Sequence, residues 1–264
     1  MLINKHMHGF TLVEMAIVLL IVGLLLGGLV PVISGQVEQK RNSETRKQLE
    51  EIKDALIGYA IINGRLPCPA ISGSNGLEDP IPVTGDCTYF SSTTNASNNY
   101  LPAATLGLSG TNSSGLLVDA WGNPIRYAVS SSNSTSPAYT KVFTTSSNMS
   151  NVGISNLTVS NLSPDLLVCS TASTSNSSCS VSNSTLASNA VAVIYSTGKN
   201  GGSGGTGTDE AENLNPNGTD SHGNVFVSHT PAGSSATNGE FDDLMTWISP
   251  NVLISRMVSA GQLP

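Results

Sequence analysis

One ionisable side chain, Glu14, stands at the edge of a long apolar segment. Residues 15–37 contain no Asp, Glu, Lys or Arg. As a helix rising about 1.5 Å per residue, this segment is about 34 Å long, enough to cross the hydrocarbon core of a bilayer. A carboxylate at the start of such a segment is costly unless it has a partner. Glu14 is therefore predicted to be a functional residue.

Two simpler interpretations compete, a secretory signal peptide and a plain signal anchor. A signal peptide has an apolar core of about 7–15 residues followed by a cleavage site of small residues. Here the apolar segment is longer, and no such site follows it. A signal anchor explains the hydrophobicity, but neither Glu14 nor the Gly9-Phe10 junction before it.

Residues 9–14, with the sequence GFTLVE, resemble the prepilin peptidase site of type IV pilins and type II secretion pseudopilins. The resemblance implies that a leader, residues 1–9, is removed by cleavage after Gly9 and that the new N-terminal residue, Phe10, is N-methylated. Glu14 then falls at the fifth mature position. Pro31 falls where many members carry a proline that loosens the helix.

The resemblance assigns Glu14 to assembly rather than catalysis, and electrostatics supports this. The cationic amine of Phe10 and the carboxylate of Glu14 cannot both be satisfied within one straight helix. In a filament, the amine of one subunit can face the carboxylate of the next, which favours one register in a low dielectric. The implied partners are prepilin peptidase, other pilin or pseudopilin subunits, an inner-membrane assembly platform and membrane lipid.

The predicted element that positions these residues is one helix, residues 10–63. Its first part, 10–37, is expected to be transmembrane and its second part, 38–63, amphipathic, because Leu49, Ile52, Leu56 and Tyr59 form an apolar stripe. Residues 64–264 form the predicted globular domain. The expected fold class is α+β and pilin-like, with the long N-terminal helix packed on an antiparallel sheet that carries long loop insertions.

Two strands of this sheet can be predicted. A Gly-Asn-Pro turn precedes residues 125–129, and the stretch Asp119 to Tyr127 resembles the Asp-x-Trp-Gly-x-x-x-x-Tyr segment of the major pseudopilin. Residues 190–195 give the strongest strand signal and are expected to be the central strand. After Ser249-Pro250, a short terminal helix or strand is expected.

The globular part is acidic. Residues 66–264 carry four Lys or Arg and twelve Asp or Glu, a net charge of 4 − 12 = −8. Nucleic-acid binding requires a basic face, so it is not expected. The resemblance implies a single-pass protein of the inner membrane whose domain lies in the periplasm and which then joins a filament in the periplasm or at the cell surface.

The four cysteines, Cys68, Cys87, Cys169 and Cys179, all follow the apolar segment. Outside the cytoplasm they are expected to be oxidised, and no C-x-x-C spacing suggests zinc or redox chemistry. Three pairings exist. Proximity in the sequence favours Cys68 with Cys87 and Cys169 with Cys179.

Residues 239–247 resemble the end of the major pseudopilin, where an aspartate four residues before a tryptophan helps to hold Ca²⁺. Asp243, with Asp242 beside it, matches that aspartate, and carboxylates are suitable ligands for this hard cation. The acidic segment 209–212 either supplies further ligands or is a solvated loop. His222 and His229 are expected to be unliganded.

Enzyme motifs are weak in this chain. Residues 201–205 satisfy G-x-S-x-G, but no helix signal follows, as a nucleophile elbow requires. We therefore expect no catalytic residue. The leading hypothesis is a structural subunit, in a minor role, of a type IV pilus or a type II secretion pseudopilus. The alternatives are a tip adhesin that binds a ligand through the Ser/Thr/Asn-rich insertions, and a membrane-anchored periplasmic enzyme.

Overall fold

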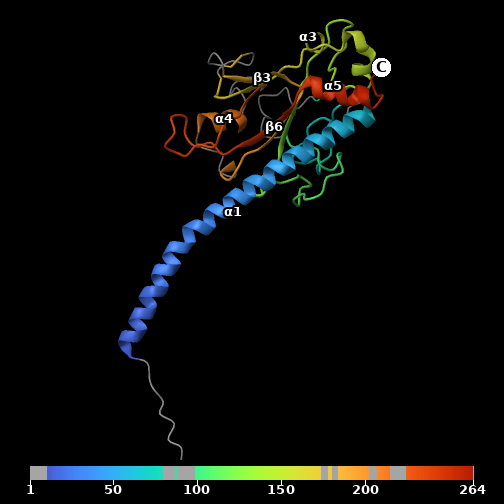
Figure 1. The fold of residues 1–264 in the computed structure, drawn as a ribbon. Helices are drawn as coiled ribbons and strands as arrows, with labels where there is room; N and C mark the ends of the chain where they lie inside the picture. The colour runs from blue at the N-terminus through green and yellow to red at the C-terminus, as the bar shows by residue number, and fades with distance from the viewer. Residues whose placement is uncertain are drawn as a thin grey trace, which may run out of the picture. The chain divides into compact units, whose positions relative to one another are not determined.

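A computed structural model describes most of the chain and divides it into two compact units, Met1–Ser43 and Glu44–Pro264 (Figure 1). For residues 26–34 it describes the backbone alone. The described residues are 11–79, 87, 99–173, 178–179, 184–201, 207–214 and 224–263.

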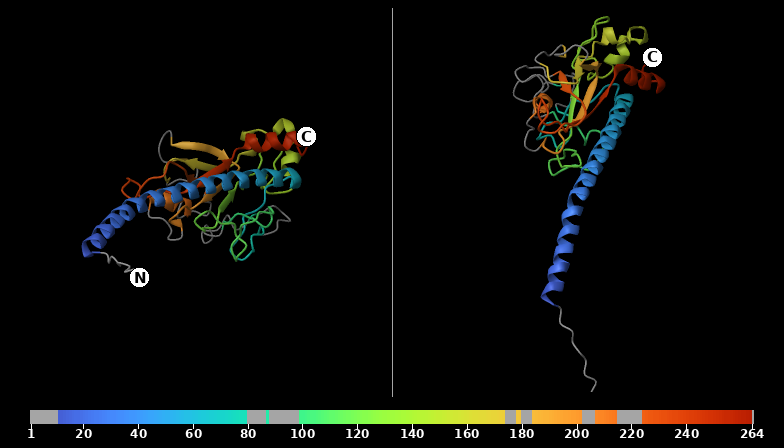
Figure 2. Two further views of the ribbon diagram at one scale, coloured as in Figure 1. Left: turned by 60° about the horizontal axis from the view of Figure 1, so that its bottom comes forward. Right: turned by 60° about the vertical axis from the view of Figure 1, so that its left-hand side comes forward.

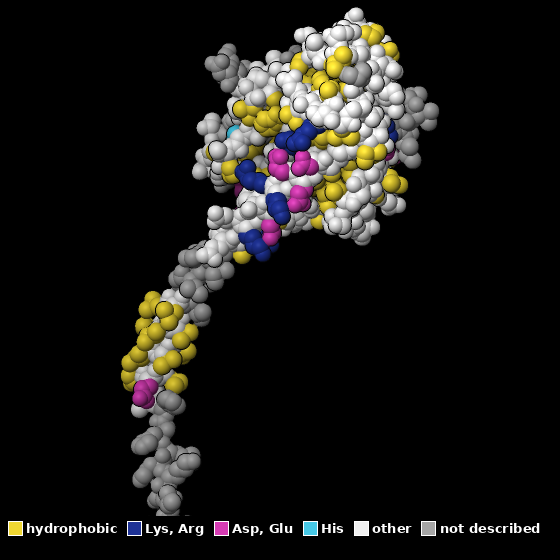
Figure 3. Space-filling model, turned by 45° about the vertical axis from the view of Figure 1, so that its right-hand side comes forward, with side chains coloured by type: hydrophobic (Ala, Val, Ile, Leu, Met, Phe, Trp, Pro, Cys, Tyr) yellow, Lys and Arg dark blue, Asp and Glu magenta, His cyan; other side chains and the backbone are white. Residues whose placement is uncertain are grey.

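Helix α1, Leu12–Asn63, confirms the predicted long helix from Leu12 onward. It ends at Gly64, whose φ of +67° suits glycine and whose N–H donates to the carbonyl of Ala60. Apolar side chains are exposed over the described first part of α1 (Figure 3). Within the described residues, no helix is both long and apolar enough to cross a membrane. The predicted transmembrane segment, 10–37, includes Phe10 and the side chains of 26–34, which lie outside the described residues.

The first sheet lies at the centre of the second unit. Its strands are β1 (Arg126–Val129), β4 (Ala192–Ser196) and β6 (Leu244–Ile248), in the order β1-β4-β6 with both pairs antiparallel. The predicted strands 125–129 and 190–195 are thus confirmed, and the second of them is central. Side chains alternate between the faces of the sheet, so Tyr127, Ile194 and Ile248 share one core with the part of α1 that follows Ser43.

A second sheet covers the opposite face of the first. Its strands are β2 (Leu166–Cys169), β3 (Thr185–Ala190) and β5 (Val225–Val227), in the order β3-β2-β5. The β2–β3 pair is antiparallel and the β2–β5 pair is parallel, so this second sheet is a mixed sheet. Val168 and Phe226 of this sheet pack with Val193 and Tyr195 of the first. The second unit therefore has three layers: the end of α1, the antiparallel sheet and the mixed sheet.

Short helices complete the second unit. They are α2 (Asn148–Val152), a 3₁₀ turn (Ile154–Asn156), α3 (Val159–Leu162), α4 (Thr208–Leu214) and α5 (Pro250–Ser259). The terminal element is a helix, because the Ser249 hydroxyl caps α5 and Pro250 occupies its first turn. Figures 1 and 2 show α5 beside the C-terminal end of α1, where Leu253 and Met257 join the core.

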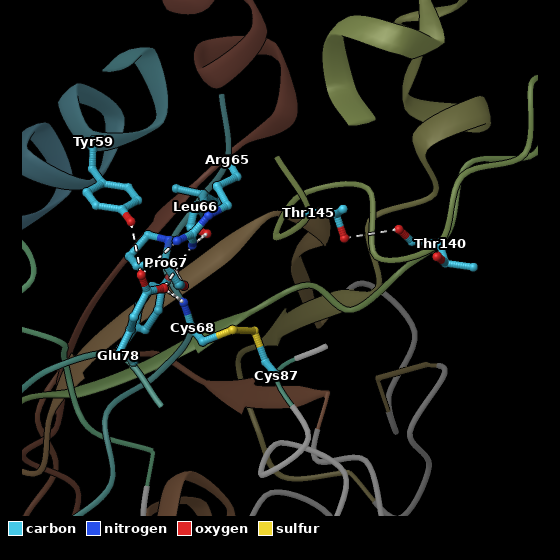
Figure 4. The surroundings of a disulfide bond; sticks show 10 residues. Tyr59, Arg65, Leu66, Pro67, Cys68, Glu78, Cys87, Thr140 and Thr145 are labelled. Atoms are coloured by element: carbon cyan, nitrogen blue, oxygen red, sulfur yellow. Dashed lines mark hydrogen bonds and ion pairs between the residues drawn. A yellow bond between two sulfur atoms is a disulfide. The ribbon is translucent and has the colours of Figure 1, made fainter. Parts of the chain in front are cut away.

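Two disulfides close the loops of this unit, Cys68–Cys87 and Cys169–Cys179. They are the pairings that proximity in the sequence favours. Beside the first one, the guanidinium of Arg65 donates two hydrogen bonds to the carboxylate of Glu78, at 2.7 and 2.8 Å (Figure 4). The N–H of Cys68 donates to the same carboxylate at 3.0 Å. This buried ion pair fixes the chain just after α1 and next to the bridge.

Candidate functional sites

The start of α1 positions the carboxylate of Glu14. The backbone N–H and the hydroxyl of Thr11 both donate to Glu14 Oε2 at 2.9 Å, and the N–H of Glu14 donates to Thr11 Oγ1 at 3.2 Å. This reciprocal arrangement is a capping box, in which a threonine and a glutamate three residues later satisfy the free N–H groups of a helix start. The carboxylate is exposed and lies at the positive end of the helix dipole, which favours an anion.

The capping role of Thr11 was not predicted from the sequence, although the spacing Thr-x-x-Glu could have indicated it. The other residues of the predicted processing site, Gly9 and Phe10, lie outside the described residues. Pro31 lies within α1, and its side chain also lies outside the described residues. The structure thus places the Glu14 side chain, and the roles predicted for Gly9, Phe10, Glu14 and Pro31 stay predictions.

Three carboxylates converge in the second unit. Glu210 comes from α4, and Asp242 and Asp243 directly precede β6; oxygen atoms of the three side chains lie within 4.8 Å of one another. The structure therefore brings together the two predicted calcium ligands and adds one residue of the acidic segment 209–212. Glu210 and Asp243 are buried, and Asp242 is half-buried. We call these three residues the acidic cluster.

Backbone and amide donors hold the acidic cluster in place. The N–H of Lys199 donates to Asp242 Oδ2 at 3.1 Å, and the side-chain amide of Asn200 donates to both oxygens of Glu210 at 3.0 Å. The N–H of Asp242 donates to Glu210 at 3.0 Å. Gly198, with φ of +62°, lies so close to the Asp242 carboxylate that a Cβ would collide with it. Only glycine fits there.

The electrostatics of the acidic cluster favour a bound cation. Burial, together with the charge of Glu210, raises the pKa of Asp242 to about 6. Burial also raises the pKa of Asp243 well above its usual range. The buried Oδ1 of Asp242 has no hydrogen-bond partner within the described residues. Carboxylates that repel one another in a partly dry site, with one oxygen unsatisfied, fit the ligand preferences of Ca²⁺.

The Asp-x-Trp-Gly turn supports the loop beside the acidic cluster. Asp119 Oδ1 accepts hydrogen bonds from the N–H groups of Trp121 and Asn123, and Asp119 Oδ2 accepts one from the Ser196 hydroxyl at 2.5 Å. The side-chain amide of Asn123 then donates to the carbonyl of Gly198 at 2.6 Å. From the sequence, this turn was predicted only to precede a strand. Its asparagine also fixes the glycine that touches Asp242.

The histidine predicted to be unliganded, His229, pairs with another residue of α4. Its Nε2 lies 3.2 Å from Asp209 Oδ2, and its ring stacks on Phe241 at 3.8 Å between centroids. Asn238 also donates to Asp209 Oδ2 at 2.9 Å. Asp209, His229 and Asn238 line a cavity of about 220 Å³. His222, and residues 202–205 of the G-x-S-x-G match, lie outside the described residues.

Comparison with protein families finds one match, to the prokaryotic N-terminal methylation motif, over residues 4–30. The matched stretch contains the Gly9-Phe10 junction and the capping box of Thr11 and Glu14. Among curated proteins and among solved structures, no match to the chain is found. The match supports the interpretation of the N-terminal segment and does not extend to the two sheets.

Proposed function

We propose that this chain, which carries the N-terminal signature of type IV pilins and type II secretion pseudopilins, is a structural subunit of such a filament and a minor one. The methylation motif, with Glu14 at the fifth position after the cleavage point, carries the proposal. A motif of this kind points to a structural subunit rather than an enzyme.

In the proposed pathway, prepilin peptidase cleaves after Gly9 and Phe10 is methylated. Residues 10–37 anchor the chain in the lipid of the inner membrane, with the pilin-like globular domain in the periplasm. An assembly platform in that membrane then adds the subunit to a filament, in the periplasm or at the cell surface. The exposed apolar side chains at the start of α1 are consistent with lipid or neighbouring helices around them.

Glu14 directs this assembly. In the free chain its carboxylate is held by Thr11 at the helix start, so it is already oriented before a neighbour arrives. In the filament the cationic amine of Phe10 from the next subunit replaces water beside it. An ion pair that forms in a low dielectric strongly favours this register over slipped ones.

The first experiment is mass spectrometry of the N-terminal peptide from the membrane-extracted protein. A peptide that starts at methylated Phe10 is expected; one that starts at Met1 would overturn the processing.

The second experiment tests Glu14. The substitution Glu14→Gln is expected to leave processing unchanged but lower the incorporation of the chain into filaments by about ten-fold or more, since the ion pair is lost. The matched variant Thr11→Val removes the two capping hydrogen bonds of the Thr11 hydroxyl and keeps the charge of Glu14. Incorporation of the Glu14→Gln chain at the wild-type level would contradict the role of Glu14.

The acidic cluster is the proposed calcium site. Glu210, Asp242 and Asp243 would hold Ca²⁺, and the cation would neutralise their mutual repulsion. Such a site would link α4 to the start of β6 and so stabilise the globular domain rather than take part in a reaction. This assignment is supported by the unsatisfied Asp242 oxygen and the raised pKa values.

A further inference from the structure

The cavity of about 220 Å³ that Asp209, His229 and Asn238 line has no role in the proposed calcium site. Asp209 lies in α4, His229 lies two residues after β5, and Asn238 lies in the loop before β6. Ser170, directly after β2, adds a hydroxyl to the lining. Four segments that are distant in the sequence thus meet around one recess.

The buried carboxylate of Asp209 already has a full set of neighbours. Its Oδ1 accepts hydrogen bonds from the hydroxyl of Thr171 at 3.1 Å and from the N–H of Ala172 at 2.7 Å. Its Oδ2 accepts one from Asn238 at 2.9 Å and lies 3.2 Å from His229 Nε2. A carboxylate offers about four acceptor positions. Asp209 therefore holds the wall of the cavity together, and a ligand would meet other groups.

Both donors and acceptors remain for a ligand. Within the described residues, the hydroxyls of Ser170 and Thr237 and the Oδ1 of Asn238 have no hydrogen-bond partner. A hydroxyl can both donate and accept, and an amide oxygen accepts. The methyl groups of Ala232 and Ala236 add apolar contact. Positions 236–238 are exposed, so this side of the cavity opens to solvent.

These features favour a small, uncharged ligand that carries several hydroxyl groups. Among the described residues, no Lys or Arg lines the cavity, so an anionic ligand would lie near the carboxylate of Asp209 without a counter-charge. A cation would have to displace the donors that already satisfy Asp209. The volume is smaller than the roughly 300–1,000 Å³ of pockets for drug-sized ligands. It therefore suits a single sugar ring rather than an extended chain.

We propose that this cavity binds one neutral sugar residue, either a free monosaccharide or the end residue of a glycan. Ser170, Thr237 and Asn238 exchange hydrogen bonds with the hydroxyls of the sugar, and the two alanines contact its C–H groups. The site adds a binding activity to a chain whose proposed function is structural, and it does not depend on that function. A ligand of this size is expected to bind with a Kd of about 1 mM.

Saturation-transfer NMR of the full-length chain, solubilised in a detergent without a sugar headgroup, detects binding of this strength. The probes are the methyl glycosides of mannose, galactose and N-acetylglucosamine, each at about 10 mM, ten-fold above the expected Kd. Transfer of saturation to at least one probe is expected. Transfer to none of them would overturn the proposal and leave a recess that holds only water.

Variants assign the binding to the cavity. Ala236→Phe fills the opening from an exposed position and is expected to weaken binding of the probe by about ten-fold or more, because the ring occupies the space of the sugar. Ala260→Phe adds the same bulk at the exposed end of α5, which does not line the cavity, and is expected to change nothing. Equal binding by Ala236→Phe and the wild type would overturn the proposal.

A milder variant covers the case in which Ala236→Phe does not fold. Thr237→Val keeps the shape of an exposed side chain and removes one hydroxyl, so it is expected to raise the Kd by about five-fold. Resistance of each extracted chain to protease, with its disulfides intact, reports that the domain is folded. An unchanged Kd in a folded Thr237→Val chain would contradict the proposed contact.

A second arm distinguishes the two sources of the sugar. A trisaccharide that carries the bound sugar at its non-reducing end is compared with the methyl glycoside. Transfer of saturation to the end residue of the trisaccharide would support recognition of a glycan. Binding of the methyl glycoside alone would support a free monosaccharide. Mass spectrometry of the N-terminal peptide tests the proposed function separately, so failure of one proposal leaves the other standing.

Discussion

At the scale of single residues, the buried carboxylate of Glu78 depends on its hydrogen-bond donors to stay charged. Burial alone would raise its pKa, but the hydrogen bonds from Arg65 and from the N–H of Cys68 outweigh burial and lower the pKa below its usual value of 4.5. The side chains of Arg65 and Glu78 are only 12% and 7% exposed. Removing one partner would leave a buried charge without compensation.

We therefore expect Glu78→Gln to lower the free energy of unfolding by about 3 kcal/mol at pH 7. Because the folded pKa is depressed, the contribution of the Glu78 charge is fully present above the unfolded pKa of 4.5 and is lost as the pH falls through the folded pKa. Urea unfolding of the detergent-solubilised chain at pH 7 and at pH 3 measures both effects. Exposed Glu51→Gln is the control. If Glu78→Gln lowered the free energy of unfolding equally at the two pH values, the charge of Glu78 could not be the source of the stabilisation.

Asp242 should show the opposite dependence on pH. Its folded pKa, about 6, lies above the ordinary value of 3.8, so without a cation its ionisation destabilises the fold as the pH rises through this interval. In the presence of a calcium chelator, Asp242→Asn is expected to raise the stability at pH 7.5 by up to about 2 kcal/mol, after allowance for screening of a half-exposed group, and to have little effect at pH 4.

Calcium should reverse the order of stability of the wild type and the Asp242→Asn chain. Addition of Ca²⁺ at pH 7.5 is expected to raise the Tm of the wild type and to leave the Tm of Asp242→Asn nearly unchanged, because binding to the folded state alone stabilises it. Thermal unfolding with and without chelator measures this. A wild-type Tm that does not respond to Ca²⁺ removal would refute the metal site and leave the filament proposal intact.

At the scale of elements, α4 connects the two sheets. Its Asn213 donates from Nδ2 to the carbonyl of Val227 at 2.9 Å and to Asp243 Oδ2 at 2.7 Å, while its Oδ1 accepts from the N–H of Val227 at 2.7 Å. The hydroxyl of Tyr195 donates to the Asn213 carbonyl. One fully buried asparagine thus holds β5, β4 and the residue before β6.

The substitution Asn213→Leu is expected to cost about 3 kcal/mol, because similar volume is kept while the buried groups of Val227 and Asp243 lose their partners. Hydrogen exchange of the Val227 amide should accelerate more than that of β4 amides. Ala211→Ser, on the exposed side of α4, is the control. Unchanged protection at Val227 would show that β5 is held by other contacts.

The elements differ in how far the sequence could predict them. The end of α1 and strands β1 and β4 carry clear signals, namely an apolar stripe that ends in Asn-Gly, a Gly-Asn-Pro turn and a run of β-prone apolar residues. The mixed sheet carries weaker signals, of which the short apolar run of β2 is the clearest. In β3, with the sequence TLASNA, only Ala190 is buried, and β5 has three residues, so neither shows an apolar alternation long enough to detect. The partners of these strands are set by tertiary packing.

The candidate site was likewise predicted only in part. Asp243, with Asp242 beside it, could be found only through the resemblance of residues 239–247 to the end of the major pseudopilin. Glu210 could not be distinguished from a solvated glutamate, because α4 buries its acidic residues against the usual pattern of an amphipathic helix. Its role depends on Asn200, which lies in the preceding loop and donates to both oxygens of the Glu210 carboxylate.

At the scale of the whole molecule, the two disulfides lie in different layers and are expected to stabilise different layers. Cys68 follows α1 beside the core that α1 shares with the first sheet, whereas Cys169 ends β2 and packs with Leu167 and Val225. By loop entropy, closing a loop of this size contributes about 3 kcal/mol. Replacing both Cys169 and Cys179 with Ala should therefore loosen the mixed sheet first.

Hydrogen exchange of the extracted full-length chain checks this expectation. Amides of β2 and β5 should lose protection in the Cys169→Ala/Cys179→Ala chain, while those of β4 and of α1 from Thr45 onward keep theirs. The Cys68→Ala/Cys87→Ala chain is the matched comparison, and it should affect the α1 layer instead. Uniform loss of protection in the first chain would show that the layers unfold as one cooperative unit.

The run from Thr185 to Ser196 passes from the mixed sheet into the antiparallel sheet, with only Val191 between β3 and β4. The N–H of Val191 is bonded to Ile248 and its carbonyl to Ser130, so the crossing point itself is anchored in the antiparallel sheet. The mixed sheet is therefore joined directly to the central strand, β4, rather than inserted at a loop. No single excision can delete it cleanly, and grafting it onto a shorter scaffold would require transplanting the middle strand as well.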